Sequence, residues 1–326
     1  MDIELIGKLR GNKQAAWRNL LEKSGLSPDE QLDSTVLIWE SDTLIATGSR
    51  WGNILKCIAV DDSHRGEDLT ATVLTQLRQD AFSHGYSHLF LYTKPQNEFM
   101  FSNLFFYPVA RTDTVLLMEN HQDGIRSFLS TLSASAGEPI GAAVMHCDPF
   151  TKGHRHLIET AAKECGRVYV FVLSEDRGTF SAKDRLEMVR LGTQDLPNVT
   201  VLPTGPYLIS AATFPTYFLK EREKAGQIQC LLDIDIFTRY FGPKFGIQRR
   251  YVGTEPLSPM TAQYNEALAA ALPAKGIALH QVPRLESEGR PISASAARAS
   301  LQDAQALEKL LPQTTFHYLK EHNLLK

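Results

Sequence analysis

The segment from Ile140 to His154 constrains the fold more than any other part of the chain. Its first residues, Ile140 to Met145, form a short apolar run typical of a buried strand, and a polar turn separates this run from a helical pattern. A helix that begins directly after such a turn presents free backbone N–H groups at its N-terminus, where a phosphate is bound most readily. The segment therefore predicts an α/β domain that handles a nucleoside triphosphate.

Strand and helix patterns alternate from residue 140 to the end of the chain. This alternation predicts a parallel sheet wrapped by helices. The expected strands are 140–145, 168–173, 199–202, 250–253 and 279–282. The expected helices are 154–165, 182–191, 214–225, 234–241 and 262–271, and the rest of the chain is expected to be helical apart from a break at Pro312.

The first 120 residues show short strand patterns around one long helix, which predicts a smaller mixed α/β domain. The expected strands are 35–39, 44–48, 55–60, 88–93 and 115–118, and the expected helix is 68–85. Because 326 residues exceed the usual size of one hydrophobic core, two domains are expected. A Ser- and Ala-rich stretch with helical spacing from Ile125 to Leu132 marks the joint. The expected parts are domain 1–120, a connecting helix and linker 121–138, and domain 139–326.

Composition excludes several classes of protein. The formal net charge of -3 provides no basic surface for holding nucleic acid, so we expect no nucleic-acid partner. The four cysteines, Cys57, Cys147, Cys165 and Cys230, have no zinc-ligand spacing, which fits a reduced compartment. The N-terminus lacks the features of a signal peptide, and no segment is apolar enough to span a bilayer. We therefore expect a cytoplasmic protein that does not insert into a membrane.

The turn before the helix at His154 carries residues suited to phosphate chemistry. Transfer at an α-phosphate needs donors that stabilise charge on the phosphoryl oxygens more than it needs a nucleophilic side chain. Gly153 allows close approach of the backbone, the His154 ring can donate a hydrogen bond, and Thr151 and Lys152 can reach phosphates from the turn. The alternative is a plain helix start with Asp148 in an Asx turn and an exposed histidine.

Two later segments have related features. In the stretch 291–298, Ser293 or Ser295 is expected to cap a helix, and Arg298 in its first or second turn can bind two phosphate oxygens at once. Gly253 and Glu255 follow an expected strand, in the region where a carboxylate commonly binds ribose hydroxyls in open α/β sheets. The same residues also fit a Ser-capped helix with a solvated arginine, and a simple turn.

Together these residues resemble the nucleotidylyltransferase superfamily. Its signature is a His/Thr-x-Gly-His turn after the first strand and an Ile-Ser-x-x-x-x-Arg segment near the end. Thr151–His154 and Ile292–Arg298 match these motifs in the right order, and Phe180–Val189 is similar to the superfamily's mid-domain stretch. The resemblance implies a Rossmann-like parallel sheet of the nucleotidylyltransferase type.

Closer still, the chain resembles the citrate lyase ligase family over most of its length. The similar stretches are Asp148–Thr151, Ala212–Pro215, Val252–Pro256, Thr261–Asn265, Pro291–Ser295, Thr93–Pro95, Phe105–Pro108 and Leu116–Asn120. One departure is His146-Cys147-Asp148, where the family usually has asparagine at one or more positions.

This resemblance implies an ATP-dependent ligase. Acetate would attack the α-phosphate of ATP to give acetyl-adenylate and pyrophosphate. The thiol of a CoA-like prosthetic group on the citrate lyase acyl carrier subunit would then take the acetyl group and release AMP. A magnesium ion is expected on the β- and γ-phosphates, with no metal ligand from the protein. The expected catalytic residues are His154, Lys152 and Arg298, and the expected nucleotide-binding residues are Asp148, Phe150, Thr151, Gly153, Gly253, Glu255, Ser293 and Ser295.

In this family the N-terminal domain is similar to GCN5-type acetyltransferases, in which a loop-to-helix turn cradles the pyrophosphate of coenzyme A. The matching positions are Arg65–Thr70, where Asp68 and Thr70 replace the usual glycines. An acidic side chain opposes a pyrophosphate, so docking of the carrier's CoA-like arm is a second possible use of this domain. Three further functions stay open for the chain: an adenylyl- or cytidylyltransferase acting on a phosphorylated small molecule, an acetyl-CoA-dependent acetyltransferase, and a binding module that keeps only the fold.

Overall fold

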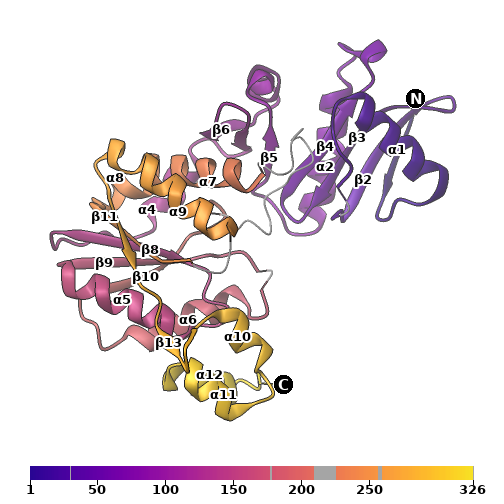
Figure 1. The fold of residues 1–326 in the computed structure, drawn as a ribbon. Helices are drawn as coiled ribbons and strands as arrows, with labels where there is room; N and C mark the ends of the chain where they lie inside the picture. The colour runs from indigo at the N-terminus through magenta and orange to yellow at the C-terminus, as the bar shows by residue number, and fades with distance from the viewer. Residues whose placement is uncertain (30, 177, 209–224, 256–258, 326) are drawn as a thin grey trace. The chain divides into compact units, whose positions relative to one another are not determined.

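The computed structural model describes residues 1–29, 31–176, 178–208, 225–255 and 259–325. Met1–Gly124 belong to one compact unit, and most of the described residues from Ile125 onward belong to a second (Figure 1). Both units are α/β, as the sequence predicts. The limits 1–120, 121–138 and 139–326 remain predictions. Of the expected elements, the helix 214–225 lies almost wholly outside the described residues.

The N-terminal unit contains a seven-stranded sheet in the order β1-β2-β3-β4-β5-β7-β6. All neighbouring strands are antiparallel except β4 and β5, which are parallel because a helix, α2, connects them. The strands are β1 (Asp2–Ile6), β2 (Ser34–Glu40), β3 (Thr43–Trp51), β4 (Ile54–Val60), β5 (Phe90–Thr93), β6 (Tyr107–Arg111) and β7 (Leu116–Glu119). The helices are α1 (Gly11–Lys23), α2 (Leu69–Ser83) and α3 (Glu98–Asn103).

Sequence patterns missed β1, α1, α3 and β6. The edge strand β1 is mostly exposed, so it lacks a clear apolar alternation. In α1 the buried residues are Trp17, Leu20 and Leu21, which cover only one helical turn. The helix α3 has six residues, too few for a periodic pattern.

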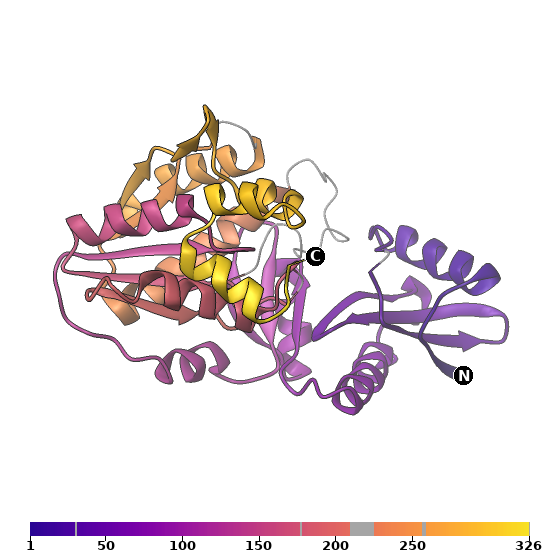
Figure 2. The same cartoon turned by 90° about the horizontal axis from the view of Figure 1, so that it is seen from below.

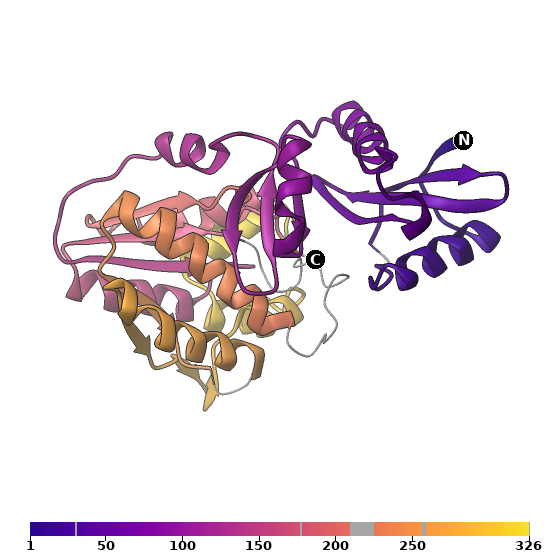
Figure 3. The same ribbon diagram turned by 90° about the horizontal axis from the view of Figure 1, so that it is seen from above.

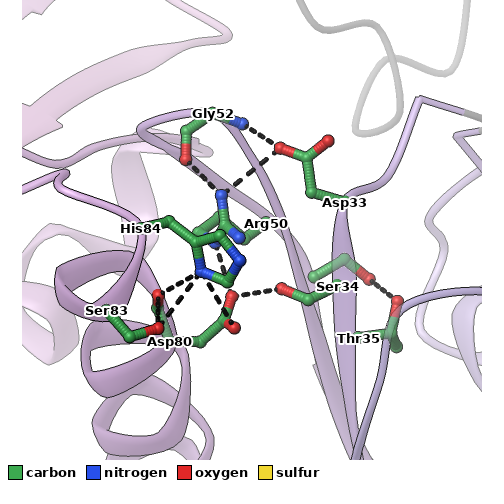
Figure 4. Close-up of polar contacts among 9 residues, drawn as sticks. Asp33, Ser34, Thr35, Arg50, Gly52, Asp80, Ser83 and His84 are labelled. Atoms are coloured by element: carbon green, nitrogen blue, oxygen red, sulfur yellow. Dashed lines mark hydrogen bonds and ion pairs between the residues drawn. The ribbon is translucent and has the colours of Figure 1, made fainter.

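A buried polar network ties α2 to the sheet of this unit (Figure 4). Arg50 on β3 donates to the Asp80 carboxylate on α2 at 2.6 Å, and Ser34 on β2 donates to the same carboxylate at 2.6 Å. The Arg50 guanidinium also donates to the Gly52 carbonyl at 2.9 Å and to Asp33 at 3.3 Å. Burial alone would raise the pKa of Asp80, but the bonds from Ser34 and Arg50 lower it overall. The network therefore fixes the register of α2 against β2 and β3.

The second unit contains a five-stranded parallel sheet in the order β10-β9-β8-β11-β12. Its strands are β8 (Ile140–Met145), β9 (Arg167–Val172), β10 (Val199–Pro203), β11 (Arg249–Gly253) and β12 (Ala278–Val282). The strand order reverses between β8 and β11, which pair only at Gly141 with Arg249 and at Ala142 with Arg250. Beyond these pairs the ladder between the two strands ends, so their carboxyl ends frame a topological switch point, where open α/β sheets bind ligands.

Helices cover both faces of this sheet. On one face lie α5 (Lys152–Glu164) and α6 (Ala182–Thr193), with the C-terminal helices against them (Figures 1 and 2). The other face carries a π-helical turn (Phe237–Phe241), α8 (Gly242–Phe245) and α9 (Pro259–Ala271) (Figure 3). The other α-helices in the described residues are α4 (Gly124–Ser130), α7 (Ala225–Ile236), α10 (Ala294–Ala299), α11 (Ala304–Leu310) and α12 (Gln313–Glu321).

One local expectation was wrong. A two-stranded hairpin, β13 (Glu286–Ser287) and β14 (Arg290–Pro291), lies in a stretch expected to be helical. Gly289 between the strands has φ +72°, a left-handed conformation that forms a tight turn and does not continue a helix. Across the described parts of the chain, no helix is long and apolar enough to cross a membrane.

Candidate active site

The turn between β8 and α5 holds the ring of His154 in one tautomer. Thr151 is the N-cap of α5, and its Oγ1 accepts a hydrogen bond from the backbone N–H of His154 at 3.3 Å. In return, the backbone N–H of Thr151 donates to Nδ1 of His154 at 3.0 Å. Because the Nδ1 lone pair accepts this bond, the neutral ring carries its proton on Nε2. His154 is therefore preorganised as a hydrogen-bond donor through Nε2.

The surroundings of His154 keep its ring uncharged. Burial lowers the pKa of His154 to about 4, and the positive field of Arg284 and the nearby His146 act in the same direction. Phe150, which is fully buried, stacks beside the ring with centroids 6.0 Å apart. At neutral pH the ring is thus a neutral hydrogen-bond donor.

Gly153 is where the two distant sequence motifs meet. A Cβ atom on Gly153 would lie 3.2 Å from the carbonyl oxygen of Ile292, closer than most side chains tolerate. Ile292 directly precedes Ser293, the N-cap of α10, whose Oγ accepts from the backbone N–H of Ala296 at 3.1 Å. Glycine therefore lets the start of α10 pack directly on the start of α5.

Arg298 on α10 also contacts the turn after β8. Its guanidinium donates to the carbonyl of Asp148 and, at 3.1 Å, to Oγ of Ser295. The Asp148 carboxylate lies 3.7 Å from the same guanidinium and accepts the backbone N–H groups of Thr179 and Phe180, both at 2.9 Å. Asp148 is therefore an anchor for the loop after β9, while one third of the Arg298 side chain stays exposed beside the turn.

Lys152 contacts the carboxyl end of α11. Its Nζ donates to the carbonyls of Glu308 at 2.7 Å and Lys309 at 3.2 Å. Both carbonyls belong to the last turn of α11, where a cation is favoured by the helix dipole. In this structure Lys152 fastens α11 to the start of α5.

Gly253 and Glu255, which are predicted to bind the nucleotide, lie at the end of β11 and in the turn that follows it. The Glu255 side chain is almost fully buried and accepts a hydrogen bond from Arg284, which also donates to the Thr254 carbonyl at 2.8 Å. The Gly253 carbonyl accepts from the Asn265 side chain on α9 at 2.9 Å. Since Arg284 also acts on the pKa of His154, the turns after β8 and β11 share one electrostatic environment.

Sequence reasoning missed the role of Arg185, a fully buried residue in the first turn of α6. Its guanidinium donates to the carbonyls of His146 at 2.9 Å and Leu173 at 2.8 Å, which follow β8 and β9, and to that of Phe180 at 3.2 Å. Arg185 thus holds together the carboxyl ends of two neighbouring strands. The one feature of the sequence that could have drawn attention to Arg185 is its position within Phe180–Val189, the stretch similar to the superfamily's mid-domain segment.

The carboxylates near the site are already engaged, Asp148 by backbone amides and Glu255 by Arg284. Within the described ranges, no three or more His, Cys, Asp or Glu side chains form a group that could hold a metal ion. Two of the stretches that resemble the family, 212–215 and part of 261–265, lie outside the described residues or side chains. The fully buried Tyr207 packs against Phe128 at 5.7 Å between ring centroids.

Several known proteins are similar to this chain. The model of the citrate lyase ligase C-terminal domain matches residues 140–319. The citrate (pro-3S)-lyase ligase of Escherichia coli (strain K12) is 37% identical over 331 residues, which cover 98% of this chain and 94% of that protein. The corresponding ligase of Klebsiella pneumoniae is 37% identical over 318 residues, covering 95% of this chain and 93% of its own length. Among solved structures, Escherichia coli ElaA covers 37% of this chain and 99% of its own at 15% identity, with a TM-score of 0.33.

Proposed function

The chain belongs to the citrate lyase ligase family, and on that basis we propose that it acetylates the prosthetic-group thiol of the citrate lyase acyl carrier subunit at the expense of ATP. The observation that carries this proposal is the 37% identity over 98% of the chain. The geometry at Gly153 supports it, because the two phosphate-binding motifs are in direct contact there.

The proposed reaction has two steps. First, a carboxylate oxygen of acetate attacks the α-phosphorus of ATP, the bond to the bridging oxygen of the β-phosphate breaks, and pyrophosphate leaves with acetyl-adenylate remaining. Second, the thiolate of the prosthetic arm attacks the acetyl carbon, the bond to the AMP oxygen breaks, and AMP leaves. The thiol proton passes to solvent when the thiolate forms.

His154 and Arg298 are the proposed catalytic side chains. The Nε2–H of His154 would donate to a phosphoryl oxygen whose negative charge grows in the transition state, and a neutral donor at this place needs no proton transfer. Arg298 would bind the phosphates with the N–H groups that its bonds to Asp148 and Ser295 leave available. The cap of α5 uses the N–H of His154, so the N–H groups of Lys152 and Gly153 are offered to phosphate oxygens as well.

The other predicted residues would act indirectly, by holding the catalytic side chains and their helices in place. Lys152 holds α11, and with it the neighbouring α10, against the turn. Thr151 orients His154, and Phe150 packs beside its ring. Ser293 caps the helix that carries Arg298.

The turn after β11 would bind the ribose. Glu255, whose carboxylate is held by Arg284, would accept a hydrogen bond from a ribose hydroxyl, and Gly253 would let the ligand approach the strand end. Asn265 holds the Gly253 carbonyl and would keep this turn in place.

Magnesium would enter with ATP. The carboxylates nearest the turn are engaged by amides and by arginine, so the described residues fit a metal ion that is held by the β- and γ-phosphates and not by a dedicated protein cage. Such an ion would neutralise charge on the leaving pyrophosphate.

We also propose that the reaction takes place in the cytoplasm, because it uses ATP and because the four cysteines are free and buried, as in a reduced compartment. With a formal net charge of -3, no nucleic-acid partner is proposed. The partners are acetate and the acyl carrier subunit.

The test is to incubate the full chain with ATP, magnesium and labelled acetate, with and without deacetylated citrate lyase. We expect acetate-dependent exchange of pyrophosphate into ATP without citrate lyase, and stoichiometric AMP and labelled carrier with it. Pyrophosphate release that depends on a phosphomonoester and not on acetate would instead establish an adenylyl- or cytidylyltransferase. AMP formation that is independent of acetate would refute the ligase proposal.

A further inference from the structure

His146, the residue directly after β8, has no role in the reaction steps described above, yet it lies inside the proposed site. Its backbone carbonyl accepts a hydrogen bond from Arg185 at 2.9 Å, which fixes the strand end that carries it. His146 acts electrostatically on the pKa of His154, and Arg298 acts in the same way on the pKa of His146. Because such effects weaken with distance, the ring of His146 lies near both proposed catalytic side chains.

One nitrogen of the His146 ring faces a carboxylate. Nε2 lies 3.6 Å from Oε1 of Glu175, which follows β9, and this distance is just beyond a hydrogen bond. Nε2 is buried and has no hydrogen-bond partner among the described residues. The carboxylate favours a proton on the nitrogen that it faces, so the neutral ring carries its proton on Nε2 and keeps a lone pair on Nδ1. The side chain is 37% exposed although Nε2 is buried, so a ligand can reach another part of it.

The surroundings of His146 keep the ring neutral but ready to accept a proton. The titratable and charged groups that act on it are Arg185, Glu175, Asp148, Arg298 and the neutral His154. Burial is the largest effect and lowers the pKa of His146 below its ordinary value of 6.5; the two arginines act in the same direction, and the two carboxylates act against it. Once the ring is protonated, the nearby Glu175 carboxylate stabilises the imidazolium, as the carboxylate does in catalytic histidine–carboxylate pairs.

Of the two steps of the proposed reaction, only the second needs a base. Acetate is already ionised at neutral pH, whereas a free thiol has a pKa of about 8.5 and attacks as its thiolate. His154 is unsuited to remove the thiol proton, because its Nδ1 accepts from the backbone of Thr151 and its Nε2 carries a proton. A neutral imidazole with a free lone pair beside the phosphate turn meets the requirement, and His146 provides it.

We propose that His146 is the general base of the thiol-transfer step and that Glu175 is its positioning residue. The S–H bond of the prosthetic-group thiol breaks as its proton moves to Nδ1 of His146, and the sulfur forms a bond to the acetyl carbon. The bond from that carbon to the AMP oxygen then breaks, and its electron pair leaves with AMP. The imidazolium passes the proton to solvent, which restores the neutral ring. This assignment rests on the proposed function, because it concerns the second of its two steps.

The experiment measures the transfer step alone. The full chain is first incubated with ATP, magnesium and labelled acetate and is then mixed with deacetylated citrate lyase, and the single-turnover rate of label transfer is followed against pH. The wild-type rate should change by less than about threefold between about pH 6.5 and pH 8, because the base is neutral throughout. In His146→Asn the thiol must ionise by itself, so the rate should rise about tenfold per pH unit over the same range. The variant should therefore be about tenfold or more slower near neutral pH, and the difference should shrink to under about threefold near pH 9.

Two further variants and one further measurement serve as controls. His156→Asn makes the same change at a half-buried position of α5 and should leave the transfer rate and its pH dependence unchanged. Glu175→Gln should slow the transfer and move the acidic limb of the pH profile to lower pH, because loss of the carboxylate lowers the pKa of His146 further. The wild type gives a measurement that needs no variant: its transfer step should be slower in heavy water than in ordinary water, since a proton moves as the thiol attacks.

Acetate-dependent pyrophosphate exchange separates this inference from the proposed function. Exchange needs no base, so His146→Asn should keep it within about threefold of the wild type. An equal loss of exchange and transfer in the variant would overturn the base assignment, and so would an unchanged transfer rate near neutral pH or a loss that does not shrink as the pH rises. In each of these cases wild-type exchange would leave the ligase function standing. Absence of exchange in the wild type would refute the ligase function, and the base assignment with it.

Discussion

Replacement of His154 by alanine tests the chemistry of the site most directly. The variant removes one preorganised donor, and loss of such a donor typically lowers kcat by about 10²–10³. It also leaves the backbone N–H of Thr151 without the Nδ1 acceptor, so the capping box of α5 is broken, which should cost about 1 kcal/mol of stability. The loss of rate and the loss of stability can be separated, because they differ in magnitude and are measured by different assays.

The assay is acetate-dependent pyrophosphate exchange, with the melting temperature measured in parallel. Ser181→Ala is the matched control: Ser181 caps α6 by accepting the N–H of Asp184 at 3.1 Å, so its loss should destabilise the same unit by about 1 kcal/mol. We expect the control to keep its exchange rate and His154→Ala to lose about a hundredfold or more. Exchange by His154→Ala within about threefold of wild type would refute the assigned role.

The pH dependence gives a second check on His154. The pKa of its ring is lowered from 6.5 to about 4 in the folded protein, so the ring stays neutral and its contribution to the rate should not change between about pH 6 and pH 8. The unfolded chain binds this proton at a higher pH than the folded protein does. The contribution of the neutral ring to the free energy of unfolding is therefore fully present above about pH 6.5 and is lost as the pH falls toward 4. The neutral-donor assignment would be contradicted if the wild-type rate depended on a protonated group with a pKa near 6.5 and if His154→Ala lacked this pH dependence.

Three further substitutions probe the packing around the site and the N-terminal unit. Gly153→Ala should push the Ile292 carbonyl away, because the added Cβ would lie 3.2 Å from its oxygen, and should raise KM for ATP while leaving the free energy of unfolding within about 1 kcal/mol of wild type. An unchanged KM would show that the close packing of Ile292 on Gly153 is not needed. Lys152→Met should lower stability by about 0.3–1 kcal/mol with less than about a tenfold fall in exchange rate, and a hundredfold fall in the rate would show instead that its ammonium acts on the phosphates. Asp80→Ala should cost about 3–5 kcal/mol in denaturant unfolding because it leaves Arg50 buried without its carboxylate, and a cost under about 1 kcal/mol would contradict that account.

Local patterns identified the elements that carry the site. The apolar run Ile140–Met145 is β8 to the residue, and the expected helix 182–191 begins at Ala182 as α6, with Ser181 as its N-cap. The capping box that orients His154 spans only Thr151 to His154, so its geometry is encoded within four residues. Such features follow from neighbours a few positions apart, which is why sequence periodicity and capping preferences reveal them.

Contacts between distant segments were beyond the reach of these patterns. Arg298 contacts the Asp148 carbonyl, Lys152 lies on the last turn of α11, and Arg185 joins the ends of β8 and β9. In each pair the donor is a long side chain with several accessible rotamers, so its partner depends on how the elements pack and not on its own neighbours in sequence.

The sequence by itself determined that a polar turn with Gly153 and His154 follows a buried strand and begins a helix, and that Ser293 and Arg298 belong to a second capped helix. Only the tertiary structure decided that these two helix starts touch at Gly153 and that Glu255 is paired with Arg284. The physical reason is that helix starts and strands depend on short-range backbone preferences. A functional site, in contrast, forms where tertiary packing brings together residues that are far apart in the sequence.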